Sequence, residues 1–492
     1  MRDGNKEMRN PVLQRWADAC PSAPALLSPS GEILRTAGDI AGEAAGFFGQ
    51  LGGDAGAVAL QTGNHVSFPA LLLAAWQAGR AVCLYDADVR GGLRDELDRE
   101  MGVTLRVTSE SAHLRFGRVA GRGPVAKPGD LSSMNSSDAA PTGQGRIMCE
   151  TQGGAGACPR LGDSAPLGHP PAACPIDLYK LTSGTVSRPQ ALGFSAAQLL
   201  ADCDQVCAGM GLGEGDLNFG VISFAHSYGF SNLITPLLCR GIPLVVATDA
   251  LPRAIQSGLT ATRATILPAV PAMFRALLSC DALPGSLRLC ISAGAPLDPG
   301  LARDFRERFG RKIHSFYGAS ECGGICYDRT DDAVAAPGFV GQPLEGVDVE
   351  LSDPSGPSRI RVRSAAFGDG NFEPADLLVR EADGFRIVGR ESDFLNIGGR
   401  KASPGEIEDV LVRCPGVREA VVCGVADPSR DQEICALIAG ACDPAVLRQH
   451  CGSALPTWKI PRRFAFVDRI PVTPRGKVNR AGIARDFFGA GN

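Results

Sequence analysis

The sequence predicts an α/β protein: a large N-terminal domain with mostly parallel sheets covered by helices, followed by a small, mobile α+β domain. Three observations support this prediction. The chain has 492 residues, enough for roughly two to four domains. After Tyr179, short apolar runs alternate with helical patterns, which is typical of a parallel sheet covered on both faces. In the last hundred residues a helix start is followed by several strand-like runs.

The first part of the chain, about residues 11–107, has the apolar periodicity of ordered structure. Phe68–Gln77 predicts a largely buried helix, and Ala81–Tyr85 predicts a short buried strand after it. The composition then changes, because Gly117–Pro175 is rich in Gly, Pro, Ser and Ala with little periodicity. We expect a flexible insert there and assign it no chemistry.

The alternating region supplies the main sheet. Apolar positions on one helical face predict a helix through Leu199–Met210, and Gly209–Gly213 then marks its C-terminus, since a dinucleotide-binding loop would follow a strand. The further expected helices are Tyr228–Cys239, Pro271–Leu278 and Leu301–Phe309. The expected strands are Phe219–Ser223, Pro243–Ala247, Thr265–Leu267, Leu287–Ser292 and Ile313–Phe316.

The last part of the chain predicts a separate small domain. Ser403 at the N-cap, Pro404 at the first position and Glu406 at the third predict a helix that starts with a capping box. Strand-like runs follow at Glu419–Val425, Glu433–Ala439 and Arg463–Val467. The polar stretch 389–393 suits a hinge, so we expect domains of 1–388 and 389–492.

Composition excludes several classes of protein. There are 49 Lys and Arg against 53 Asp and Glu, a net charge of −4, which gives no electrostatic reason to expect nucleic acid as a partner. No apolar run is long enough for a membrane span, and the charged N-terminus lacks the apolar centre of a signal peptide. The 17 cysteines are scattered without a CxxC pair, so we expect reduced, mostly buried thiols in a cytoplasmic protein.

Four groups of residues could take part in catalysis or binding, but each group alone would be weak evidence. Thr182–Pro189 follows a short strand and offers hydroxyl and N–H donors to phosphate, although such runs are usually plain turns. Tyr317–Glu321 ends a strand with a ring, a hydroxyl and a carboxylate, yet it could be a capped turn. The turn Pro474–Lys477, together with Asp376 and Arg390, could carry ordinary surface charges.

Taken together, and in their order along the chain, these segments resemble motifs of the adenylate-forming superfamily. This superfamily includes acyl-CoA synthetases, peptide-synthetase adenylation domains and firefly luciferase. The resemblance covers nearly the whole chain. Further segments of the same form are Phe224–Gly229, Gly294–Leu297, Gly341–Pro343, Gly389–Arg390, Gly398–Lys401 and Glu406–Glu408.

The resemblance implies that a carboxylate attacks the α-phosphorus of ATP and expels pyrophosphate. Lys477 and Glu321 would be catalytic: Lys477 would offset the repulsion between the two anions, and Glu321 would hold Mg²⁺. Thr182, Ser183, Gly184 and Thr185 would cradle the pyrophosphate. The remaining nucleotide contacts implied are Tyr317 on adenine, Asp376 on the ribose hydroxyls, Arg390 on the sugar, and Gly294, Ala295, Pro296, Gly318 and Ser320 around them.

A second step would transfer the acyl group to CoA after the small domain rotates. Gly398 and Gly399 would then line the tunnel for the pantetheine arm, where a Cβ would obstruct it. The acyl pocket would include His226, Ser227, Gly229 and Gly323, with His226 as a wall or gate. The segment Phe224–Gly229 has no carboxylate to pair with an ammonium, so α-amino acids are disfavoured and a fatty or aryl acid is expected.

Departures from the family pattern leave alternatives open. Val186, Ser187 and Gln190 replace residues usual in the phosphate loop, Pro374-Ala375 replaces the Thr-Gly before Asp376, and Ser392 replaces the usual hinge residue. The first hypothesis is an acyl- or aryl-CoA synthetase. The second is a stand-alone ligase that loads a separate acyl carrier protein. The third is a degenerate nucleotide-binding homologue with a regulatory role.

Overall fold

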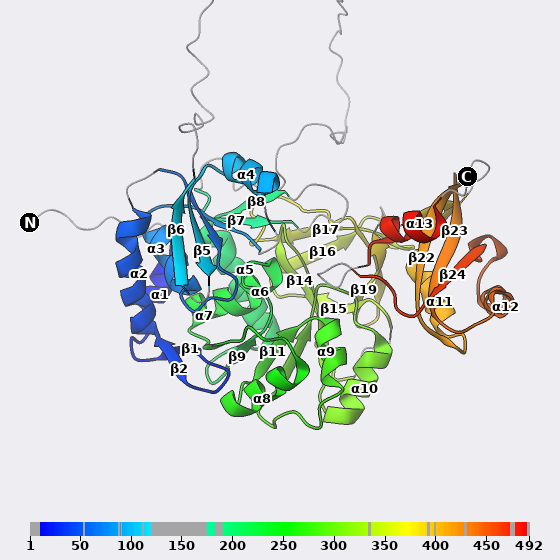
Figure 1. The fold of residues 1–492 in the computed structure, drawn as a ribbon, viewed down its shortest axis with the longest axis horizontal. Coiled ribbons are helices and arrows are strands. Elements are labelled where there is room, and N and C mark those ends of the chain that lie inside the picture. The colour runs from blue at the N-terminus through cyan, green and yellow to red at the C-terminus, as the bar shows by residue number, and fades with distance from the viewer. Residues whose placement is uncertain are drawn as a thin grey trace, which may run out of the picture.

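The computed structural model describes residues 10–52, 55–86, 89, 91–110, 113–119, 175–182, 190–332, 336–390, 394–397, 400–427, 431–472 and 478–489. It is an α/β protein with a large N-terminal part and a smaller C-terminal lobe (Figure 1). Most of the predicted insert lies outside these residues. The preceding strand ends at Arg118, next to the predicted start at about residue 117.

A six-stranded sheet begins the fold, in the order β6-β5-β3-β4-β7-β8. Its four central strands, β5, β3, β4 and β7, run parallel. The predicted strand at 81–85 is confirmed as β4. The bounds are β3 Ala57–Gln61, β4 Val82–Leu84, β5 Val103–Glu110, β6 His113–Arg118, β7 Leu178–Leu181 and β8 Ala191–Phe194.

A thirteen-stranded sheet follows, in the order β16-β17-β18-β19-β15-β14-β13-β12-β11-β9-β10-β1-β2. The strands from β13 to β1 in this order are parallel to one another, as the alternation predicted. Their bounds are β1 Pro24–Leu27, β9 Asn218–Gly220, β10 Leu244–Val246, β11 Ile266–Ala269, β12 Leu289–Ser292 and β13 Ile313–Ala319. The antiparallel strands are β2 Ile33–Thr36, β14 Gly323–Tyr327, β15 Phe339–Pro343, β16 Val347–Leu351, β17 Ser358–Ser364, β18 Asp376–Glu381 and β19 Gly384–Arg390.

Helices cover both sheets. The apolar helix α3 has nine of its ten residues buried, because it lies in the largest hydrophobic cluster. The helices are α1 Pro11–Ala17, α2 Ala37–Leu51, α3 Phe68–Gln77, α4 Gly91–Glu100, α5 Ala196–Met210, α8 Pro252–Thr262, α9 Pro271–Leu277 and α10 Pro299–Phe309. The predicted helices at 68–77, 271–278 and 301–309 are confirmed.

The predicted helix Tyr228–Cys239 is interrupted. It divides into α6 Ser227–Gly229, a π-helical turn Phe230–Ile234 and α7 Thr235–Arg240. The amide of Thr235 bonds to the carbonyl of Phe230, five residues back. Pro236 lacks the N–H that would continue the regular α-helical ladder, so the helix changes register just before it.

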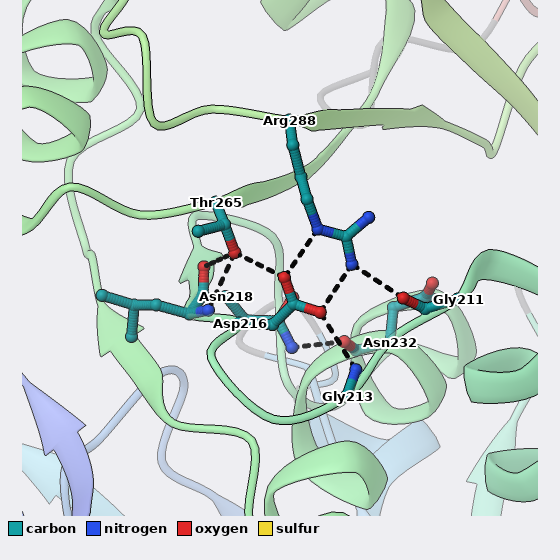
Figure 2. Close-up of polar contacts among 8 residues, drawn as sticks. Gly211, Gly213, Asp216, Asn218, Asn232, Thr265 and Arg288 are labelled. Atoms are coloured by element: carbon teal, nitrogen blue, oxygen red, sulfur yellow. Dashed lines mark hydrogen bonds and ion pairs between the residues drawn. The ribbon is translucent and has the colours of Figure 1, made fainter.

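The glycine run after α5 is a helix C-terminus, as predicted. Gly211 has a φ of +61° and caps the helix. The loop is then fixed by Asp216, which accepts bonds from Gly213 N, from Thr265 Oγ1 at 2.9 Å, and from Arg288 Nε at 2.7 Å (Figure 2). These contacts join the loop to β11 and β12, so this segment has a structural role.

The C-terminal lobe contains a five-stranded sheet with α-helices on it. Its bounds are β20 Leu395–Ile397, β21 Arg400–Ala402, α11 Pro404–Val412, β22 Val417–Asp427, β23 Asp431–Gly440, α12 Pro444–Ala454, β24 Arg463–Val467 and α13 Arg480–Phe488. The predicted capping box is wrong. The Ser403 hydroxyl donates instead to the carbonyl of Val388 at 3.0 Å, and Glu406 pairs with Lys459. Both side chains are thus used in contacts between distant segments, and the position of the division at residue 388/389 remains a prediction.

Two further observations concern the described part of the chain. None of its helices is long and apolar enough to cross a membrane. Its 14 cysteines are free thiols, 12 of them buried, in agreement with the prediction that most thiols are buried.

Candidate functional site

The candidate site lies where the parallel strands β11, β12 and β13 end. The Tyr228 hydroxyl donates to the carbonyl of Ile291 at 2.9 Å, which places the segment Phe224–Gly229 over the ends of these strands. Gly294, Ala295 and Pro296 follow β12 as an exposed loop, and Gly294 has a φ of +84°. Ligands of parallel α/β sheets bind at the carboxyl ends of the strands, so these segments occupy the place where a ligand is expected.

Tyr317 and Asp376 come together at the same edge. The Tyr317 hydroxyl donates a 2.8 Å hydrogen bond to Asp376 Oδ2. Burial, and then the charge of Asp376, raises the pKa of the Tyr317 phenol well above its ordinary value. Asp376 begins β18 and lies opposite Arg390 at the end of β19. The backbone therefore brings the three residues predicted to hold the nucleoside to one place.

Glu321 lies in the turn of the β13–β14 hairpin, just after Gly318 and Ser320. The carboxylate is half-buried. Mg²⁺ is usually held by one or two carboxylates together with substrate phosphates, and a single carboxylate at a strand end fits that pattern. No group of three or more potential metal ligands occurs in the part of the chain that the structure describes.

The predicted acyl segment is held by close backbone packing. A Cβ at Gly229 would lie 2.0 Å from the carbonyl oxygen of Ser223, so glycine is required there for packing. Gly323 has a φ of +76°, and a Cβ on it would lie 2.1 Å from Asp202 Oδ1. Gly323 is therefore required by the conformation of the turn and by its packing against Asp202. The Ser227 hydroxyl is buried without a hydrogen-bond partner in the described residues.

The base of the predicted phosphate loop is closed by a pair of residues. The Thr182 amide donates to the Gln190 carbonyl, and the Gln190 amide donates to Thr182 Oγ1, both at 3.0 Å. Other predicted site residues lie outside the described residues: Ser183, Gly184, Thr185, Gly398, Gly399 and Lys477. The side chain of Arg390 also lies outside the described part of the structure. Their roles remain predictions.

Three charged residues near the site were not predicted from the sequence. Asp86 Oδ2 lies 2.7 Å from His226 Nε2. Asp202, on α5, accepts from the Gly324 amide and from the Ser231 hydroxyl, and so supports the segment after Glu321. Lys180, on β7, is fully buried beside Asp202, with its ammonium 4.8 Å from the Phe194 ring centroid.

The sequence signal for Lys180 is a charge inside the apolar run Leu178–Leu181. Burial lowers the pKa of Lys180, and the nearby Asp202 opposes that shift. A buried charge needs a nearby partner, but the sequence does not say which residue supplies it.

Two family models match this chain. The model for AMP-binding enzymes matches residues 13–363, and the model for the AMP-binding enzyme C-terminal domain matches residues 406–477. The chain belongs to the AMP-binding enzyme family. The resemblance to adenylate-forming enzymes that the motifs predicted is therefore confirmed. This AMP-binding enzyme belongs to the class of AMP-forming acyl-CoA synthetases and ligases.

Individual relatives agree with this assignment. The chain is 30% identical to a sulfoacetate–CoA ligase from Cupriavidus necator over 356 residues, 66% of this chain and 70% of that protein. It is 26% identical to a 3,4-dihydroxybenzoate–[aryl-carrier protein] ligase from Bacillus anthracis over 306 residues, 62% of this chain and 72% of that protein. Matches to two further curated relatives span 66% and 58% of their lengths.

The fold is also that of a solved structure. ATP-bound MatB from Rhodopseudomonas palustris superposes with a TM-score of 0.75 over 97% of this chain and 98% of that chain, at 20% identity. This match confirms the predicted fold class: a large N-terminal domain followed by a small C-terminal one.

Proposed function

We propose that this AMP-binding enzyme activates a fatty or aryl carboxylic acid as its acyl-adenylate, with release of pyrophosphate, and then transfers the acyl group to CoA. The observation that carries the proposal is the hydrogen bond between Tyr317 and Asp376 at the sheet edge where the β13–β14 turn with Glu321 and the acyl segment also lie. Family membership supports ATP and CoA as the cosubstrates.

Each of these residues would have its own role in the first step. Asp376, oriented by Tyr317, would accept the ribose hydroxyls, and Glu321 would hold Mg²⁺ against the phosphates. The metal would neutralise charge on the leaving pyrophosphate. Lys477 would bring an ammonium to the attacking carboxylate and the nucleotide, which lowers the repulsion as the two anions approach.

The pocket favours an acid without an α-ammonium group. Asp202 lies behind Gly323, but both of its oxygens already accept hydrogen bonds. Asp86 is paired with His226. Neither carboxylate is therefore available as the partner that a buried ammonium would require, so α-amino acids stay disfavoured.

A second candidate acceptor is the phosphopantetheine arm of a separate acyl carrier protein. It is favoured by the 26% identity to a ligase whose name specifies an aryl-carrier protein. The two acceptors have the same thiol chemistry, so both fit the same active site.

Pyrophosphate release with a panel of fatty, aryl and α-amino acids tests the proposal. We expect release with at least one fatty or aryl acid, and thioester only after CoA is added. Thioester formed on a carrier protein but not on CoA would overturn the assigned acceptor. Absence of release with every acid would overturn the enzymatic proposal.

A further inference from the structure

His226 and Asp86 form a close side-chain pair between the two sheets of the large domain. His226 Nε2 and Asp86 Oδ2 are 2.7 Å apart, and the two side chains are 41% and 28% exposed. Asp86 follows β4, while His226 is the N-cap of α6 in the acyl segment. Both side chains of the pair are thus partly open to solvent.

The strand register places Asp86 near Thr182, at the end of β7. β4 and β7 are parallel, with Val82 opposite Leu178 and Cys83 opposite Tyr179. Continuing this register puts Asp86 level with Thr182, the first residue of the predicted phosphate loop. The imidazole, which belongs to the segment expected to bind the acyl group, therefore lies close to the strand end from which the expected phosphate-binding segment starts.

Backbone contacts hold both members of the pair. Gln61 Nε2 donates to the carbonyls of Asp86 and Val89, at 2.8 and 2.9 Å. On the other side, Asn64 donates to the carbonyl of Ile222 and accepts from the amide of Phe224, both at 2.9 Å. Both residues of the pair are therefore anchored to strand ends before any ligand binds.

We propose that His226 is the proton acceptor for the thiol in the second half-reaction, and that Asp86 is its positioning residue. This inference rests on the proposed function. With Nε2–H directed at Asp86, Nδ1 is the nitrogen that takes the proton. The S–H bond breaks as the sulfur attacks the acyl carbon, the bond from that carbon to the AMP oxygen breaks, and AMP leaves with the electron pair. The imidazolium then loses its proton to solvent.

Proton removal is a real requirement of this step. A thiol has a pKa of about 8.5 and attacks as the thiolate. A general base in place contributes roughly 10²–10⁴ in rate. Asp86 contacts the His226 ring through Nε2. A carboxylate in this position would orient the imidazole as a general base.

The experiment uses the full-length protein and separates the half-reactions. Adenylation is followed by pyrophosphate release with the best acid of the panel, and transfer by thioester formation from the presynthesised adenylate of that acid and CoA. For His226→Ala we expect transfer to fall roughly 100-fold, at least tenfold more than adenylation, and added imidazole to restore part of it. For Asp86→Asn we expect a roughly tenfold fall in transfer. His113→Ala, on the exposed face of β6, is the control and should not respond to imidazole.

Equal losses in the two half-reactions, or a His226→Ala enzyme that imidazole does not rescue, would overturn the proposal. If His226→Ala fails to fold, Asp86→Asn and His226→Gln give the same comparison of half-reactions. Failure of the proposed function is distinguishable, because the unmodified protein would then release no pyrophosphate with any acid and form no thioester from the supplied adenylate.

Discussion

The hydroxyl of Tyr317 donates to the carboxylate of Asp376, although 59 residues separate them in the chain. The bond fixes one oxygen of the aspartate at the edge where the nucleoside is expected. It also explains how a tyrosine can be buried there, since a buried phenol needs a hydrogen-bond partner.

Replacing Tyr317 by Phe tests this positioning. Removal of one hydrogen bond costs about 1 kcal/mol, a factor of roughly five. Because Asp376 is expected to bind ribose, we expect KM for ATP to rise by about that factor while kcat changes less. Steady-state kinetics with varied ATP measures this, with Tyr179→Phe, a tyrosine on β7, as the matched control. A fall in kcat with unchanged KM would contradict the assignment of Asp376 to the ribose.

Lys477→Ala tests the predicted division of labour between the two half-reactions. Loss of one preorganised charge in the transition state lowers adenylation by roughly 10²–10³. Transfer from presynthesised acyl-adenylate to CoA should be largely retained, because the second conformation is expected not to use this lysine. Rapid-quench measurement of each half-reaction gives both numbers. Lys459→Ala, which removes a lysine paired with Glu406 in the same lobe, is the control, and equal falls in both half-reactions would rule out the two-conformation mechanism.

The sequence predicted the parallel core of the fold well, because buried strands such as β12, Leu289–Ser292, are short and mostly apolar. It failed where one residue had two possible partners. Ser403 could cap its own helix or bond to Val388, and only the three-dimensional approach of β19 decides between them. Pro236 likewise marked a break that periodicity alone did not reveal.

The same limit applies to the candidate site. Ordered motifs pointed to Tyr317, Asp376 and Glu321 because their spacing has a family form. Asp86 and Asp202 belong to no such motif. Asp86 reaches the acyl segment through its contact with His226, between the two sheets, and Asp202 reaches β14 through the packing of α5. Contacts between distant segments of this kind are set by the topology, and no local pattern encodes them.

Asp216→Asn tests the loop cluster of Figure 2. Burial alone would raise the pKa of Asp216, but the bonds from Arg288, Gly213 and Thr265 outweigh it and lower the pKa. Loss of the charge leaves Arg288 with a neutral partner, and we expect unfolding to become easier by about 3 kcal/mol. Urea denaturation at neutral pH measures the change. Asp332→Asn, whose side chain is 97% exposed, should change stability by less than about 0.5 kcal/mol, and an equal effect of both substitutions would contradict a structural role for the cluster.

His314 should make the large domain less stable in mild acid. Burial lowers its pKa below the ordinary value of 6.5, against the opposing effect of the Asp328 carbonyl, which lies 2.8 Å from Nδ1. The unfolded chain therefore binds a proton that the folded chain does not, so the stability contributed by this group is complete above pH 6.5 and falls as the pH drops toward the folded pKa. The slope is at most about 1.4 kcal/mol per pH unit.

His314→Gln should flatten this dependence between about pH 7 and about pH 5.5, because the titrating group is removed. Urea denaturation at the two pH values gives the difference in the free energy of unfolding. His113→Gln provides the comparison, since His113 is exposed on β6 and its substitution should leave the slope as it is. If His314→Gln kept the slope of the unmodified protein, the acid sensitivity would have to come from carboxylates, and the ring of His314, stacked on Tyr327 at 5.5 Å, would contribute through packing alone.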